Sequence, residues 1–116
     1  MRPQDLLRVM ERRVDGAEVL EVSGEVDLLS AEVLENALLA AVSREPAVLV
    51  VDLTGVSFLA SVGMTVLLKA HRGVGKTTRI RVVSPERSTV GRALKLTGLT
   101  EALAVVDTRA EALSAA

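Results

Sequence analysis

Ser61 is the residue best placed for chemistry in this sequence, because it stands where an apolar segment gives way to a predicted helix over residues 61–71. A serine at a helix start can cap the free backbone N–H groups with its own hydroxyl. It can equally accept a phosphoryl group, because the helix dipole and the same N–H groups favour an anion there. Phe58 and Leu59, just before it, are expected to anchor the preceding loop in the core. Ser61 is therefore a candidate phosphorylation site, with simple capping as the alternative.

Four further residues are predicted to share a partner-binding surface with Ser61. Asp27 lies at a predicted strand-to-helix junction, where its carboxylate could cap the next helix or face a partner or a divalent cation. Ala60 and Val62 flank the serine, and Gly63 leaves the first helical turn free of a side chain. A partner fitted to a neutral hydroxyl would have to bury a dianion after phosphorylation, which is costly unless the charge is paired.

Catalytic, metal and cofactor chemistry find little support. The chain has no cysteine, and its single histidine, His71, is predicted to be a surface residue near a helix end. The segment of residues 73–78, which contains Gly-Lys-Thr, resembles the end of a phosphate-binding loop, but it joins a helix to a strand instead of a strand to a helix. We therefore predict no enzyme activity, catalytic residue, metal or cofactor, and read the segment as a solvated turn.

The composition also argues against nucleic acid and membranes as partners. The formal net charge is −1, from 14 basic and 15 acidic residues, and no basic run could follow a phosphate backbone. Phe58 is the only aromatic residue besides His71, so stacking platforms for bases are absent. No apolar run approaches the roughly 20 residues of a membrane span. Without cysteines or an apolar leader, a reducing cytoplasmic location is expected.

Apolar blocks alternate with helical blocks along the chain. We predict strands at residues 5–14, 18–23, 47–51, 80–83 and 103–106. Helices are predicted over residues 28–44, over 61–71 and from the Ser84-Pro85 pair to about Gly98, with a last one opening at the capping box of Thr108 and Glu111. Asp15-Gly16 is typical of a hairpin turn between the first two strands.

This order predicts an α/β fold in a single domain of residues 1–116. The strands that follow helical crossovers form a mainly parallel sheet, the opening hairpin makes the sheet mixed, and about four helices pack against it. In such folds the loops at strand ends and helix starts usually carry function.

Four segments resemble motifs of the bacterial anti-sigma factor antagonists, which are built on the STAS domain. Ser61 and Gly63 match the phosphorylated serine and the glycine of the family motif, whereas Ala60 and Val62 replace its acidic and second hydroxyl residue. The segments are Gly24-Glu25-Val26-Asp27, residues 50–58, residues 59–67 and Leu94-Lys95-Leu96-Thr97-Gly98-Leu99.

The resemblance implies partner switching. The unphosphorylated protein would bind an anti-sigma factor that is also a serine kinase, so that a sigma factor is released for transcription. Phosphorylation of Ser61 would end the complex, and a phosphatase would restore it. The alternative is a STAS module that is not phosphorylated and that senses a small ligand or serves as a scaffold in a regulatory assembly.

Overall fold

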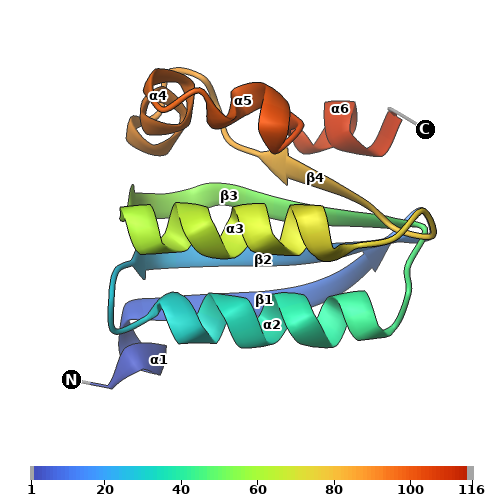
Figure 1. Cartoon of the computed structure of the whole chain (residues 1–116), viewed down its shortest axis with the longest axis horizontal. Helices are drawn as coiled ribbons and strands as arrows, with labels where there is room; N and C mark the ends of the chain where they lie inside the picture. The colour runs from blue at the N-terminus through green and yellow to red at the C-terminus, as the bar shows by residue number, and fades with distance from the viewer. Residues whose placement is uncertain (1, 115–116) are drawn as a thin grey trace.

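A five-stranded sheet forms the centre of the computed structural model, which describes residues 2–114 (Figure 1). The strands lie in the order β1-β2-β3-β4-β5, with β1 antiparallel to β2 and the other pairs parallel. Their bounds are β1 Leu7–Val14, β2 Ala17–Val26, β3 Val48–Leu59, β4 Arg79–Val83 and β5 Val105–Val106. The helices are α1 Pro3–Leu6, α2 Ala31–Ser43, α3 Ser61–Gly73, α4 Thr89–Leu96, α5 Leu99–Ala102 and α6 Arg109–Ser114. The predicted fold class is confirmed.

The opening hairpin turns at Asp15 and Gly16, as predicted. Both residues have positive φ, 51° and 82°, which is the backbone geometry of a turn that matches the twist of the two strands. The first strand nevertheless begins at Leu7, because a single helical turn, α1, occupies the residues that were predicted to start it.

β3 is much longer than the predicted strand of residues 47–51. It continues to Leu59 and stays paired with β2 through two register shifts, one between Glu21 and Ser23 and one between Gly24 and Glu25 on the β2 side. At each shift β3 contributes an extra residue, as in a β-bulge. The predicted end of this strand at Val51 is therefore wrong, and Asp52 lies within the strand.

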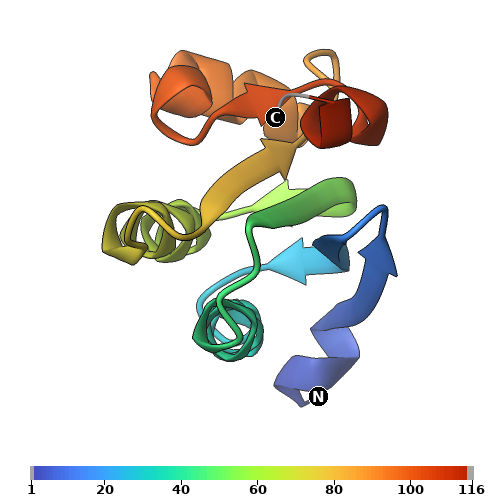
Figure 2. The same cartoon turned by 90° about the vertical axis from the view of Figure 1, so that its right-hand side faces the viewer.

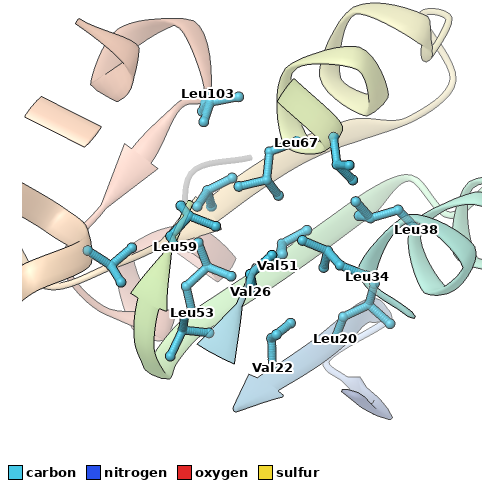
Figure 3. Close-up of a cluster of buried hydrophobic side chains, with 14 of the residues drawn as sticks. Leu20, Val22, Val26, Leu34, Leu38, Val51, Leu53, Leu59, Leu67 and Leu103 are labelled. Carbon is cyan, nitrogen blue, oxygen red and sulfur yellow. The ribbon is translucent and has the colours of Figure 1, made fainter. Parts of the chain in front are cut away.

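α2 and α3 cover one face of the sheet side by side, and α6 lies against the opposite face (Figure 2). The main core fills the space between the sheet and α2, α3 and α4; leucines that are almost fully buried, such as Leu20, Leu34 and Leu53, contribute about 2 kcal/mol each (Figure 3). Beneath α6, Ala112 packs on Val19, Val50 and Val83.

Several helix boundaries differ from the prediction. α2 begins at Ala31 and not at residue 28, because residues 27–30 form a separate hydrogen-bonded turn. α4 begins at Thr89, after Ser88 accepts a hydrogen bond from the Gly91 N–H, so Ser84 is not its cap. Gly98, with φ 75°, ends this helical region as predicted, but the single turn α5 that follows was not foreseen. Thr108 does accept a hydrogen bond from the Glu111 N–H at the start of α6.

Candidate partner-binding site

The candidate site lies at the carboxyl ends of β2 and β3, where both parallel strands lead into helices. The last residues of the strands, Val26 and Leu59, are register partners, and the Ala60 N–H donates to the Val26 carbonyl at 2.8 Å. This pairing brings the loop after β2 beside the start of α3. Asp27 and Ser61, which are 34 positions apart in the chain, therefore belong to one edge of the sheet.

Ser61 is the first residue of α3 and is exposed to solvent. Ala60 occupies the cap position in an extended conformation and has no hydroxyl to bond the free N–H groups, so Ser61 does not cap this helix. The first turn of α3 contains no acidic residue. A hydroxyl at this place is open to a modifying enzyme, and a phosphate on it would meet the positive end of the helix dipole.

Asp27 organises the loop between β2 and α2. Its Oδ1 accepts hydrogen bonds from the Leu29 N–H at 2.9 Å and the Ser30 N–H at 3.0 Å. The buried Ser30 hydroxyl donates to the Glu25 carbonyl at 2.7 Å and accepts from the Asp27 N–H at 2.9 Å. The hydrogen bond from the Ser30 N–H, more than any other contact, lowers the pKa of the Asp27 carboxyl below its usual value. Asp27 thus caps this turn and not helix α2 itself.

The remaining predicted site residues differ in how far they reach the surface. Ala60 and Val62 are partly exposed. Gly63 is buried, and a Cβ there would lie 2.5 Å from the Leu59 Cδ1 and 2.6 Å from the Val26 Cγ1. Its missing side chain therefore lets α3 approach the sheet, and Gly63 does not itself present a contact surface.

Three apolar residues near this end of the sheet are exposed and were not among the predicted site residues. Leu28 is 82% exposed, Leu29 is 60% exposed and Phe58 is 47% exposed. The prediction that Phe58 anchors the loop in the core is therefore wrong, whereas Leu59 is buried as expected. Only the spacing of apolar residues in the sequence could have indicated that Phe58 is exposed. The buried positions of β3 after Leu53 fall at every third residue, at Val56 and Leu59, and this spacing leaves Phe58 outside the core.

Residues 8–112 match the family described as STAS domain. The chain belongs to the STAS domain family. This family match covers every strand except the first residue of β1, and it includes the edge that carries Asp27 and Ser61.

Named relatives agree with the STAS assignment. The chain is 33% identical to the anti-sigma-F factor antagonist RsfB of Mycobacterium tuberculosis, over 98% of this chain and 93% of that protein. The crystal structure of an anti-sigma factor antagonist from Mycobacterium paratuberculosis is similar, with a TM-score of 0.88 and 36% identity over 99% of this chain and 97% of that one. Bacillus SpoIIAA in its phosphorylated form shares the fold, with a TM-score of 0.67 and 20% identity over 92% and 97% of the two chains.

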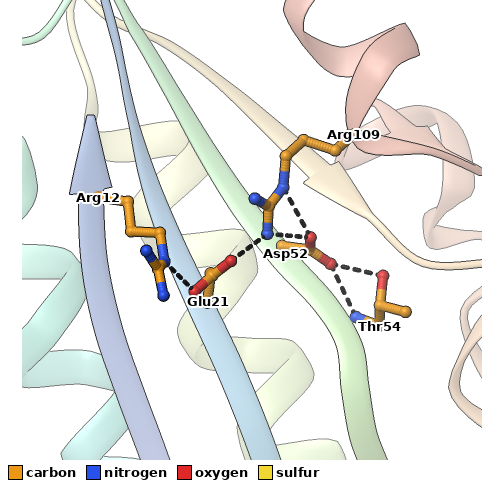
Figure 4. Close-up of polar contacts among 5 residues, drawn as sticks. All are labelled: Arg12, Glu21, Asp52, Thr54 and Arg109. Carbon is orange, nitrogen blue, oxygen red and sulfur yellow. Dashed lines mark hydrogen bonds and ion pairs between the residues drawn. The ribbon is translucent and has the colours of Figure 1, made fainter. Parts of the chain in front are cut away.

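A charged network on the opposite face of the sheet fastens the C-terminal helix of this STAS domain (Figure 4). Arg109, the first residue of α6, donates to Asp52 from its Nη2 at 2.9 Å and its Nε at 3.1 Å, and from Nη2 to Glu21 at 2.6 Å. Asp52 also accepts from the Thr54 hydroxyl at 2.6 Å, and Arg12 pairs with Glu21. The hydrogen bond from Arg109, followed by that from Arg12, lowers the pKa of Glu21.

Arg109→Met is expected to lower the Tm at pH 7 by about 5 °C, because it leaves the nearly buried Asp52 carboxylate without its cation. Since the pKa of Glu21 is lower in the folded protein, the stability that this group contributes is present above its ordinary value of 4.5 and is lost as the pH falls through the lowered value. The Tm difference between wild type and Arg109→Met should therefore shrink in acid. Thermal unfolding from pH 7 to pH 3 measures it, with the exposed Arg92→Met as control.

Other features offer little chemistry. No group of three or more His, Cys, Asp or Glu within residues 2–114 is placed to hold a metal ion. In the same part of the chain, no helix is both long and apolar enough to cross a membrane. A groove of about 340 Å³ between α2 and α3 is lined mainly by apolar residues, and its Glu35 and Lys69 pair with each other at 3.7 Å.

Proposed function

We propose that this STAS domain is an anti-sigma factor antagonist. It binds an anti-sigma factor with serine kinase activity and thereby frees a sigma factor, and phosphorylation at Ser61 ends the complex. The observation that carries the antagonist role is the similarity, over almost the full length of both chains, to an anti-sigma-F factor antagonist. The protein is a substrate in this scheme and not an enzyme. ATP and Mg²⁺ belong to the kinase, a phosphatase restores the hydroxyl, and the cycle runs in the cytoplasm, where transcription takes place.

The position of Ser61 supports the switch. The hydroxyl is exposed at the first residue of α3, and nothing in the fold depends on it as a cap. A phosphate can therefore be added without disturbing the packing, while a partner that covers the same edge would have to bury a dianion. SpoIIAA, which has the same fold, is described in a phosphorylated form, so the fold is compatible with such a modification. The replacement of the motif's acidic residue by Ala60 leaves the acceptor hydroxyl itself in place and exposed.

Incubation with the kinase-active anti-sigma factors of the source organism, ATP and Mg²⁺ tests this function. We expect intact-mass measurement to show the gain of one phosphoryl group on wild type and none on Ser61→Ala, while both unmodified proteins bind the anti-sigma factor. Thr89→Ala, which removes an exposed hydroxyl at the first position of α4, is the matched control and should be phosphorylated like wild type. Binding without phosphoryl transfer would leave the antagonist role standing and refute the switch.

A further inference from the structure

We propose that Leu28 and Leu29 form an apolar patch that anchors the partner, and that the partner meets it with an apolar pocket bordered by basic side chains. The inference rests on the proposed function, because the occupant is the anti-sigma factor. It adds the residues that would supply most of the binding energy and the chemistry of the surface that recognises them.

The apolar patch is concentrated at the candidate site. Single exposed leucines are common on protein surfaces, but Leu28 and Leu29 are adjacent in one loop and are 82% and 60% exposed, so together they offer an apolar contact surface. Phe58 is not part of this patch, because it points with its register partner Glu25 to the face of the sheet opposite to that of the buried Val26 and Leu59. Leu28 lines a shallow depression of about 370 Å³ together with Val62 and Thr65 in the first turns of α3. The patch therefore adjoins the helix start that carries Ser61.

The loop holds the two leucines in place before any partner arrives. Asp27 and Ser30 form hydrogen bonds with each other and with neighbouring backbone groups. The turn between them therefore has little conformational freedom. Apolar side chains on an ordered loop lose less conformational entropy on binding than those on a mobile one. Buried apolar anchors of this kind typically dominate the energy of an interface.

The charge around the patch defines the partner. Residues 20–43 contain no basic residue. Of their five acidic residues, Glu21 pairs with Arg109 and Arg12 on the opposite face and Glu35 pairs with Lys69, which leaves Glu25, Asp27 and Glu32, and residues 53–68 contain no charged residue at all. Glu25 is exposed at the end of β2, two residues before Asp27, and Glu32 lines the depression beside Leu28. Lys69, at the other end of the depression, is already paired with Glu35. A complementary surface is basic where it meets Glu25 and Glu32 and apolar where it covers Ser61.

This arrangement of charges also explains why phosphorylation of Ser61 would weaken partner binding. The basic groups of the partner would be placed against the acidic loop, whereas the uncharged stretch around Ser61 is covered by apolar groups. A phosphate on Ser61 would be buried without a counter-charge, which destabilises the complex.

Leu28→Ser tests the anchor against a matched control, Leu96→Ser, since Leu96 is 87% exposed on α4. Isothermal titration with the purified anti-sigma factors of the source organism should show binding weakened at least about tenfold by Leu28→Ser and unchanged by Leu96→Ser. Thermal melts should be unaltered by both changes, because neither side chain is packed. Equal affinities for the two variants would overturn the inference and leave the proposed function intact. If no anti-sigma factor binds wild type, both are wrong.

Two further measurements test the basic border and the choice of partner. The double variant Glu25→Lys/Glu32→Lys should slow association by about tenfold, whereas Glu101→Lys on α5 should not. An unchanged association rate would refute the basic border.

Sedimentation of each variant alone tests whether a second copy of this chain occupies the patch. If Leu28→Ser abolishes self-association without changing anti-sigma affinity, the patch is a homodimer contact and the inference is wrong.

Discussion

Ser61→Glu is expected to weaken anti-sigma factor binding by about 100-fold, equivalent to roughly 3 kcal/mol, because a partner that covers the start of α3 would bury an unpaired carboxylate. The stability of the folded protein should not change. A negative side chain in the first turn of α3 interacts favourably with the helix dipole, and the site is exposed. The Tm should therefore stay within a few degrees of wild type while the affinity collapses. Titration calorimetry and thermal unfolding on the same preparations measure the two quantities.

Thr89→Glu is the matched control for this experiment. Thr89 is an exposed hydroxyl residue at the first position of α4, the same helical position that Ser61 occupies in α3. It should tolerate glutamate without loss of binding. If Ser61→Glu binds as tightly as wild type, or if both variants weaken binding equally, a specific role of Ser61 is refuted.

Gly24→Ala should give the largest loss of stability, about 3 kcal/mol, which corresponds to a fall in Tm of roughly 10 °C. Gly24 has a φ of 109°, a conformation that L residues rarely adopt, and a Cβ there would lie 2.1 Å from the Leu6 carbonyl oxygen. Both the strain and the clash involve backbone, so no side-chain rotation relieves them.

Gly75→Ala separates this effect from the general cost of replacing a glycine. Nothing lies within 4 Å of a Cβ at Gly75, so the Tm of the Gly75→Ala variant should equal that of wild type or be slightly higher. Chemical and thermal unfolding of the two variants test the difference. If the Gly24→Ala protein is as stable as Gly75→Ala, the backbone at Leu6, where α1 meets β1, moves aside easily and the expected clash is refuted.

The fold class was predictable because its signals are local. The turn at Asp15 and Gly16, the β-branched run of β3 and the helical spacing of α3 each specify one element without help from the rest of the chain. The length of β3 was not predictable in this way. Its second half contains Thr54 and Gly55, which favour a turn, and only pairing with β2 through two bulges keeps these residues in the strand.

The candidate site was predictable in position but only partly in composition. Ser61 and Asp27 follow strands, so the topology places them at one edge. Leu28 and Leu29 were read as part of a helix, because an apolar pair beside a helical repeat is usually buried. Their exposure depends on the turn that Asp27 makes with Ser30, a hydrogen-bond arrangement that hydrophobic spacing does not report.

The turn closed by Asp27 and Ser30 separates two tasks within four residues. Its polar members keep the backbone in shape, and the two leucines between them bear no part of the fold. With the leucines in their proposed role as partner anchors, changes at positions 28 and 29 would alter which protein is recognised without any loss of stability. Duplicated genes that keep the polar pair and vary the leucines would yield parallel signalling circuits in one cell that do not cross-react.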